Sequence, residues 1–261
     1  MLTWYPRENQ RPLRVAVLCS HRAPGLLELL DDPRRGALFD VIACISSEHD
    51  FAGREAIMQR GVLTFVHDIH DFYRAWNARL GDLTLRAHYD EGIVQRLAPH
   101  DVDVVILCSY LYIVTAPLLD AYPAHVVNIH HSDLPKYPGL HAVRDAISAG
   151  ERATRATAHL VTPQLDAGPP IVRSWPFAVH PMIDDVRRWN ATSILKAYAY
   201  AHQEWMIEST WAPLMLSAIE LFATGELQMW GSELMISGGR DPLELEPPGR
   251  SLRSLRMRSL R

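Results

Sequence analysis

The sequence has little cysteine, with three residues of this type in 261: Cys19, Cys44 and Cys108. The number is odd, and each cysteine lies in an apolar run that predicts a strand. We therefore expect small buried thiols that stay reduced, not a disulfide framework. The alternative is a catalytic thiol, for which Cys19 is the candidate because its run ends beside a loop.

Long apolar runs and a surplus of one charge are also absent. No stretch approaches the roughly 18 consecutive apolar residues that predict a membrane span. The first twelve residues are polar and lack the apolar core of a secretion signal. The formal net charge is −4, which gives no electrostatic reason to expect nucleic acid or an anionic membrane as a partner. These absences predict a cytoplasmic protein.

Short apolar runs alternate with helical patterns in the first half of the chain. Strands are predicted at residues 14–19, 39–45, 63–66, 102–108 and 126–129. Helices are predicted at residues 25–31, 52–60, 83–97 and 117–122. Uninterrupted β-branched runs are typical of strands that are buried on both faces. We predict an α/β fold of Rossmann-like type, with a mostly parallel sheet and flanking helices.

The pattern changes after residue 153. Strands are predicted at residues 156–161 and 170–175, and a hairpin at residues 227–236. A long helical region at residues 183–211 carries Trp189, Tyr198, Trp205 and Met206, which predict core packing. A separate helix is predicted at residues 213–224, ended by Gly225.

The two ends of the chain differ in composition from its middle. Residues 240–261 are rich in proline and charge, which predicts a flexible basic tail. We therefore divide the chain into an N-terminal extension at residues 1–12, one domain at residues 13–239 and the tail.

Polar side chains gather at the end of one predicted strand. Asn128 and His130 are two residues apart in residues 126–139, VVNIHHSDLPKYPG, so both side chains face the same way. They also lie where an α/β sheet presents its ligands. Asp166, in a loop between two predicted strands, is the leading candidate for a carboxylate that orients the imidazole.

These three residue types suit acyl transfer through a tetrahedral intermediate. The amide of Asn128 can donate to an oxygen that gains negative charge, and His130 can hold or move a proton near neutral pH. No serine or cysteine nucleophile is needed if the attacking group belongs to the substrate. Taken alone, a strand-end histidine is more often structural than catalytic.

The motifs around these residues resemble the signature of folate-dependent formyltransferases. The matching positions are Asn128, Ile129, His130, His131, Ser132, Leu134, Pro135, residues 137–139, residues 156–159, Leu165, Asp166, Gly168 and Pro169. Both motifs occur in the family's order, with the family's interval between Asn128 and Asp166. The similarity covers about residues 13–236 and is strongest at residues 104–171. It implies the formyltransferase fold for the domain at residues 13–239, as the catalytic domain.

The resemblance implies a role for each matched residue. Asn128 would hold the formyl oxygen, His130 would assist proton movement, and Asp166 would pair with His130 and position a proton-relaying water. His159 would buttress the site. The formyl donor would be 10-formyltetrahydrofolate, and the acceptor an amine of a small molecule. The residues that would contact the donor are Leu111, Tyr112, Ile113, Val114, Val161 and Leu165.

This sequence departs from the family in two loops. Enzymes that formylate glycinamide ribonucleotide carry a glycine-rich phosphate loop after the first strand. Here residues 20–25 contain one glycine, which makes a backbone phosphate cradle doubtful, although Ser20, His21 and Arg22 could contact an anionic acceptor. Many relatives also have an arginine where Tyr112 stands, so the donor's glutamate tail would be held differently.

Other functions remain open at this point. The same site could hydrolyse 10-formyltetrahydrofolate, and His131 favours that deformylase branch. A metal hydrolase would use His130, His131, His141 and His159, but no metal-binding spacing is present, and we predict no metal. The chain could also be a non-catalytic binding relative, and it is compatible with a homodimer.

Overall fold

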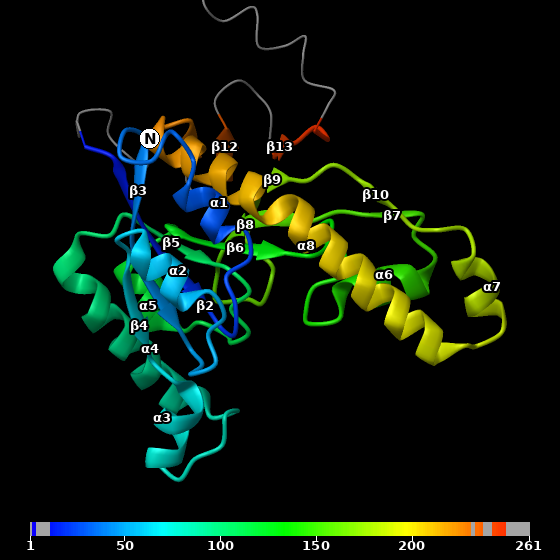
Figure 1. The fold of residues 1–261 in the computed structure, drawn as a ribbon, viewed down its shortest axis with the longest axis horizontal. Coiled ribbons are helices and arrows are strands. Elements are labelled where there is room, and N and C mark those ends of the chain that lie inside the picture. Colours follow the sequence, from blue (N-terminus) through cyan, green and yellow to red (C-terminus); the bar gives the residue numbers. More distant parts are fainter. Residues whose placement is uncertain (1, 4–10, 231–232, 237–241, 249–261) are drawn as a thin grey trace, which may run out of the picture.

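The structure is a computed structural model that describes residues 2–3, 11–230, 233–236 and 242–248. Its centre is an eight-stranded sheet with the order β13-β9-β8-β6-β5-β2-β3-β4 (Figure 1). Five neighbouring strands are parallel: β2 (Leu13–Cys19), β3 (Phe39–Ser46), β4 (Leu63–Val66), β5 (Val104–Leu107) and β6 (Val126–His130). The predicted mostly parallel sheet is confirmed.

Helices cover both faces of this sheet. The first face packs against α1 (Leu26–Leu30), α2 (Arg54–Gln59), α6 (Ala142–Ala149), α7 (Ile183–Arg188) and α8 (Thr192–Ala223). The second packs against α3 (Ile69–Ala75), α4 (Leu83–Leu97) and α5 (Ala116–Ala121), with a 3₁₀ turn at Ala98–His100. Val15 and Val17 of β2 belong to the first core cluster and Ala16 and Leu18 to the second, because successive strand residues point to opposite faces.

The remaining strands extend or flank the main sheet. β8 (Thr157–Leu160) and β9 (Pro170–Arg173) continue it in antiparallel pairing after β6. Two strands pair separately, β7 (Ala153–Thr154) with β10 (Phe177–Ala178). A hairpin of β11 (Leu227–Trp230) and β12 (Glu233–Ile236) confirms the prediction.

The chain order creates a switch point in the sheet. From β2 the chain moves outward through β3 and β4, and then returns to place β5 and β6 on the other side of β2. The loops that follow β2 and β5 therefore diverge at the carboxyl edge, which is where such sheets bind ligands.

The prediction of two separate helices at residues 183–211 and 213–224 is wrong. The first region contains α7 and the start of α8, and α8 continues through Pro213 to Ala223. A proline inside a helix costs about 3 kcal/mol. Trp211, Leu214 and Met215 on both sides of it are buried in the core, and this packing outweighs the local penalty.

The predicted burial of the bulky residues near α8 is only partly correct. Met206 is buried, but Trp189 is 72% exposed and Trp205 53% exposed. The N-terminal half of α8 extends beyond the sheet (Figure 1), so it has no second layer to cover one of its faces. Sequence periodicity alone does not reveal where a long helix leaves the core.

The two chain ends contribute more structure than their composition predicts. Leu243 and Glu244 form β13, which pairs parallel with β9 at the edge of the main sheet, and Arg155 pairs with Glu244. This part of the predicted flexible tail is therefore ordered, because it satisfies an open strand edge. Residues 249–261 of the predicted tail lie outside the described residues. At the other end, β1 (Leu2–Thr3) pairs with β11.

No helix among the described residues is long and apolar enough to cross a membrane.

Candidate active site

The three predicted catalytic residues come together on the second face of the sheet. Asn128 and His130 lie on β6, and Asn128 is paired in register with His159 of the antiparallel neighbour β8. Asp166 belongs to the loop between β8 and β9. Its Oδ2 lies 3.7 Å from Nδ1 of His130 and its Oδ1 lies 3.7 Å from Nε2 of His159. The structure therefore brings together the three predicted side chains and His159, which the resemblance places as a buttress of the site.

The hydrogen bonds of His159 define its protonation state. Its Nδ1 lies 2.9 Å from the carbonyl oxygen of Leu160, and its Nε2 lies 3.2 Å from Nδ2 of Asn128. Nδ1 must donate to that carbonyl, so Nε2 accepts from the amide. Burial lowers the pKa of His159 to about 4, which keeps it neutral near pH 7. His159 thereby fixes the amide of Asn128 with one N–H used and the other free to donate.

The segment at residues 137–139 holds both members of the His130–Asp166 pair. Nε2 of His130 lies 3.2 Å from the carbonyl oxygen of Tyr137, and the amide of Gly139 donates to Oδ2 of Asp166 at 2.8 Å. Both contacts are made by the backbone, so side-chain chemistry gave no signal for them. Gly139 has φ 89°, a conformation that favours glycine, and this is the feature of the motif that could have indicated its role.

The loop that carries Asp166 is pressed against β8. A Cβ on Gly168 would lie 1.7 Å from the carbonyl oxygen of Leu160, so only glycine permits this approach. Asp166 itself has φ 50°, which is uncommon for a residue with a side chain. Its carboxylate is nevertheless almost enclosed, with 7% of the side chain exposed. The glycine two residues later is thus what brings the carboxylate to the histidines.

The predicted donor-binding residues divide into packed and exposed groups. Tyr112, Val114 and Val161 pack in the second core cluster, so the segments before Asn128 and before Asp166 meet there. Leu111, Ile113 and Leu165 are instead exposed, Leu165 by 61%. Exposed large apolar side chains beside polar groups are typical of ligand-binding surfaces.

Two buried carboxylates hold the segment at residues 111–115. Oδ2 of Asp90 on α4 accepts from the amide and the hydroxyl of Thr115, both at 2.6 Å. Burial raises the pKa of Asp90 to about 6. At the other end, the hydroxyl of Tyr112 donates to Oε1 of Glu48 at 2.5 Å. The sequence analysis identified neither carboxylate, because each is distant along the chain from the segment that it holds.

The predicted acceptor-binding residues are mostly engaged with other protein groups. The hydroxyl of Ser20 lies 2.8 Å from that of Ser47 and accepts from the amide of Leu111 at 3.1 Å. Arg22 forms ion pairs with Glu204 and Glu208 of α8 at 2.6 and 3.7 Å. His21 is exposed. Ser20 therefore joins the loops after β2, β3 and β5 at the switch point of the sheet.

Gly25 in the same loop has a structural reason to be glycine. It precedes α1 with φ 73°, and a Cβ there would lie 2.5 Å from the backbone nitrogen of Ala212 on α8. The single glycine of the loop thus allows α8 to pack closely, which does not require a phosphate ligand.

The three cysteines and His131, the residue after His130, are enclosed by the protein. Cys19, Cys44 and Cys108 are free and buried, as predicted, and a hydrogen bond with Cys19 together with burial raises the pKa of Cys44. The ring of His131 packs on the side of α8, 5.3 Å from the ring of Trp211. Burial lowers the pKa of His131 to about 3, so this ring is neutral.

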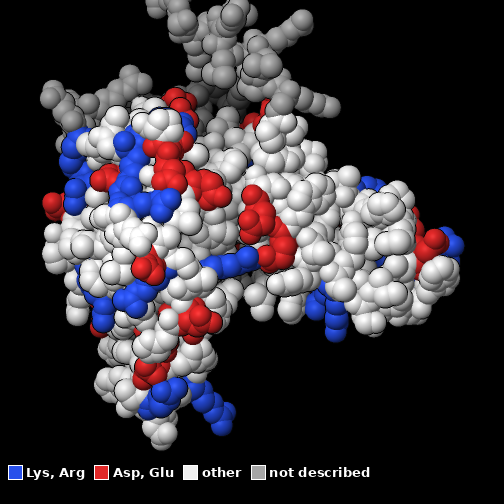
Figure 2. Space-filling view, viewed as in Figure 1, with Lys and Arg blue, Asp and Glu red and all other residues white. Residues whose placement is uncertain are grey.

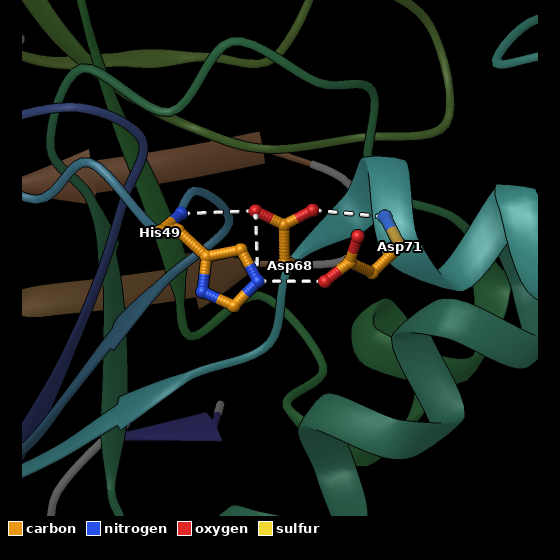
Figure 3. A group of neighbouring side chains, drawn as sticks. All are labelled: His49, Asp68 and Asp71. Carbon is orange, nitrogen blue, oxygen red and sulfur yellow. Dashed lines mark hydrogen bonds and ion pairs between the residues drawn. The ribbon is translucent and has the colours of Figure 1, made fainter.

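A different group of residues has the spacing of metal ligands. Within the described ranges, the group of three or more ligand-type side chains that converges is His49, Asp68 and Asp71 (Figure 3). The four histidines considered from the sequence do not form such a group. Asp68 is the N-cap of α3 and accepts from the amides of Asp71 and His49, both at 2.9 Å. Nε2 of His49 lies 2.6 Å from Oδ2 of Asp71, and this contact raises the pKa of His49. Capping of α3 accounts for the position of Asp68, and the contact with Asp71 accounts for that of His49.

Comparison with known sequences identifies a large matching region. The sequence model of the formyl transferase family matches residues 13–193. Residues of this chain are 33% identical over 169 positions to the trifunctional purine biosynthetic protein adenosine-3 of Drosophila melanogaster, covering 64% of this chain and 12% of that protein. They are 30% identical over 168 positions to the formyltetrahydrofolate deformylase of Bacillus subtilis, covering 64% of this chain and 52% of that protein. The chain thus spans about half or less of the length of these relatives.

Solved structures show the same architecture. Glycinamide ribonucleotide transformylase 1 from Symbiobacterium toebii superposes with a TM-score of 0.62 at 30% identity, covering 86% of this chain and 94% of that one. A formyltetrahydrofolate deformylase from Pseudomonas syringae superposes with a TM-score of 0.64 at 21% identity, covering 87% of this chain and 66% of that one. The second likeness is one of fold.

Proposed function

The chain belongs to the formyl transferase family, and from this premise we propose that it transfers a formyl group from 10-formyltetrahydrofolate to an amine of a small-molecule acceptor. This family uses 10-formyltetrahydrofolate as its formyl donor. We assign the catalytic domain to residues 13–239. The observation that carries the proposal is the convergence of Asn128, His130, His159 and Asp166 on one face of the sheet.

In the proposed mechanism, Asn128 stabilises the charge that develops on the formyl oxygen. One N–H of its amide is committed to neutral His159, and this contact holds the second N–H in a fixed direction. A fixed donor costs no reorganisation when negative charge appears, which is why such donors accelerate acyl transfer. His159 would therefore be a positioning residue for Asn128.

The pair of His130 and Asp166 would move the proton. Nε2 of His130 donates to the carbonyl oxygen of Tyr137, which leaves Nδ1 toward Asp166. The 3.7 Å between Nδ1 and Oδ2 is too long for a direct hydrogen bond. A water molecule or a substrate atom that contacts both groups would connect them. A proton released by the attacking amine and taken up at Nδ1 would face the carboxylate, and His130 could then return it to the leaving nitrogen of the donor.

Two apolar positions support the assignment of the donor. Leu111 and Leu165 stand exposed at the ends of the two segments that meet in the second core cluster, and a flat heteroaromatic ring would cover them. Deletion of such a side chain should raise the KM for the donor more than it lowers kcat, because the contact is made equally in the ground and transition states.

A second candidate function is hydrolysis of 10-formyltetrahydrofolate. It is favoured by the similarity to the deformylase of Bacillus subtilis and by the engagement of Ser20 and Arg22 with protein partners, which leaves little prepared surface for an acceptor. In this reaction water would attack in place of the amine. The same residues would act on the same carbon.

Product analysis separates the two functions. The full chain would be incubated with 10-formyltetrahydrofolate alone and with a panel of primary amines, while tetrahydrofolate, formate and formylated amine are quantified. Tetrahydrofolate formation that requires an amine and matches the formylated product supports transfer. Equal amounts of formate and tetrahydrofolate without amine support hydrolysis. Absence of turnover in both conditions would contradict both and favour a non-catalytic binding protein.

A further inference from the structure

The exposed aromatic residues near the start of α8 form part of an ordered apolar surface. Ile194, Ala197, Ala201 and Trp205 are all exposed and are spaced three, four and four residues apart. This spacing places them on one side of a helix, within about a quarter of its circumference. We call these four residues the α8 stripe. They lie on the half of the helix that extends beyond the sheet (Figure 1).

The surface around the stripe carries little charge in its central part. Figure 2 shows that the face of this projecting region is largely free of Lys, Arg, Asp and Glu side chains between an acidic patch at its base and the charges at its tip. Trp205 is also held in place. Its ring packs edge-on against Phe177 with centroids 4.8 Å apart, and also against His202 at 5.5 Å. An exposed aromatic side chain that is already fixed loses little entropy on binding.

The stripe is complementary to itself in an antiparallel arrangement, and we propose that it binds a second copy of this chain about a two-fold axis at Ala201. Residues equally distant from Ala201 then face each other across the axis. Ala197 of one copy meets Trp205 of the other, so a small residue receives a large one twice. Ala201 meets its own equivalent, which lets the helices approach to about 8 Å. Such an isologous contact closes on itself as a dimer.

Charge at the two ends of the stripe fits the same arrangement. Seven residues separate Ala201 from Glu208 and also from Ile194, so Glu208 of one copy is level with the first turn of α8 in the other. That first turn has no acidic residue, and no side chain caps it. The side chain of Glu208 is 70% exposed, and it also lies 3.7 Å from Arg22 of its own copy. A carboxylate beside an uncapped helix N-terminus is stabilised by the amides and the dipole there. A parallel arrangement would instead place the two Glu208 side chains together.

The exposed area is suited to a small stable dimer. Within the stripe, Trp205 and Ile194 are 53% and 52% exposed, and an aromatic side chain buries roughly 150–250 Å² when it is fully enclosed. The apolar centre contributed by two copies is therefore on the order of several hundred Å². A specific interface buries roughly 1,200 Å² or more in total, so a polar rim larger than this apolar centre would complete the contact.

Sedimentation velocity of the full chain tests the proposal over roughly 1–100 µM, the range in which an interface of this size saturates. The expected mass at high concentration is twice the 29.5 kDa of one chain. Ala201→Glu places two like charges on the axis and should weaken the association by about 100-fold. Ala75→Glu, the same substitution at an exposed alanine at the end of α3, should not change it. A mixture of Ala201→Glu and Ala201→Lys should associate again, because residue 201 faces itself.

Cross-linking gives an independent readout of the axis. The native cysteines are all buried, so an Ala201→Cys thiol should form a disulfide-linked dimer on mild oxidation. Lys196→Cys, exposed on the same helix but away from the stripe, should not. A chain that stays monomeric at every concentration would overturn the proposal. So would a dimer that is insensitive to Ala201→Glu, or a monomer in which the Ala201→Cys thiol is shielded from a maleimide by other residues of the chain.

Discussion

The strand-end cluster and the loop after β2 differ in how their polar groups are used. Around His130 and Asp166, the backbone of residues 137–139 fixes the side chains but leaves a gap of 3.7 Å between the reactive atoms. In the loop after β2, Ser20 and Arg22 already bind other protein groups at 2.6–2.8 Å. The first region is held open for an incoming group, whereas the second is closed by internal contacts.

This difference indicates that the protein holds groups for the chemical step more firmly than groups for recognition of the acceptor. Chemistry on the formyl carbon needs a few groups in fixed positions, and the proposed site would supply them with Asn128, His130 and Asp166. Recognition of the acceptor would need free donors near the switch point, and the chain supplies few of them in residues 20–25. The acceptor should therefore be small or weakly anionic, or it should be water.

The largest expected effect on activity comes from substitutions in the strand-end cluster. His130→Ala should lower kcat by about 10²–10⁴ if the imidazole moves a proton, and Asn128→Ala by about 10²–10³ if its amide stabilises the oxyanion. Asp166→Asn keeps the shape of the side chain but removes the charge that faces His130, so kcat should fall again. The donor's dissociation constant should change much less, because the charge appears only in the transition state.

Double variants test whether these residues act together. The three losses should be strongly non-additive, because all of the residues act on one transition state. Steady-state kinetics of the single and double variants provide the measurement. Near-wild-type activity in Asn128→Ala or Asp166→Asn would be incompatible with the proposed mechanism, and additive losses would mean that the residues do not share one site.

The next largest effect is expected from two glycine substitutions, one in the loop that carries Asp166 and one in the loop after β2. Gly168→Ala and Gly25→Ala would each place a Cβ too close to backbone atoms, at 1.7 Å and 2.5 Å. Each should cost about 1–3 kcal/mol in stability. Only Gly168→Ala should also lower kcat, by about 100-fold, because a shift of about 1 Å in its loop would displace Asp166. Thermal melts and kcat at a temperature where both variants are folded measure the split. Equal losses of kcat would show that the loop after β2 also positions reacting groups.

The sequence predicted which side chains meet at the strand end better than it predicted the far end of the chain. Alternating strands and the two motifs identified β6 and the loop of Asp166, because apolar runs and a required glycine are local signals. The anchoring roles of Asp90 and Glu48 could not be predicted, since their partners Thr115 and Tyr112 are brought near only by the fold.

The errors in α8 have a physical cause as well. Its apolar residues satisfy helical periodicity on every side, so the sequence alone predicted burial for Trp205. Tertiary packing buries the half of the helix that lies on the sheet and leaves the other half uncovered. In the same way, core contacts around Pro213 outweighed a local signal for a helix end.

A smaller effect concerns stability in acid, because burial shifts the pKa of His159 in the strand-end cluster and that of Asp90 on α4 in opposite directions. The folded pKa of His159 is about 4, below its unfolded value of about 6.5. The unfolded chain therefore binds the extra proton first, and stability that is complete above pH 6.5 is lost as the pH falls toward 4, by up to ~3 kcal/mol. Asp90, with its pKa raised to about 6, acts in the opposite direction over the range between its folded and unfolded values.

Denaturant unfolding at a series of pH values can separate these two contributions. His159→Gln should flatten the loss of stability between pH 6.5 and 4. Asp90→Asn should steepen it, because the compensating proton uptake by the folded state is removed. If the unfolding free energy of the Asp90→Asn variant stays constant through this range, then His159 is not the neutral partner of Asn128 that the hydrogen bonds indicate.

The smallest expected effect concerns Arg22 in the loop after β2. It decides whether this loop and the strand-end cluster differ as described. Arg22 is partly exposed and already paired with Glu204 and Glu208, and exposed ion pairs contribute about 0–1 kcal/mol. Arg22→Ala should therefore change the melting temperature little and raise the acceptor's KM less than about tenfold, which corresponds to under 1.4 kcal/mol. Glu204→Gln provides the matched control, since it removes the charge of the nearer of the two partners of Arg22 and keeps the guanidinium, and it should improve the binding of an anionic acceptor. A rise in KM of about 100-fold in Arg22→Ala, with no gain in Glu204→Gln, would mean that Arg22 contacts the acceptor through its existing pair. The loop after β2 would then be as prepared for its ligand as the strand-end cluster is, and the contrast between the two regions would fail.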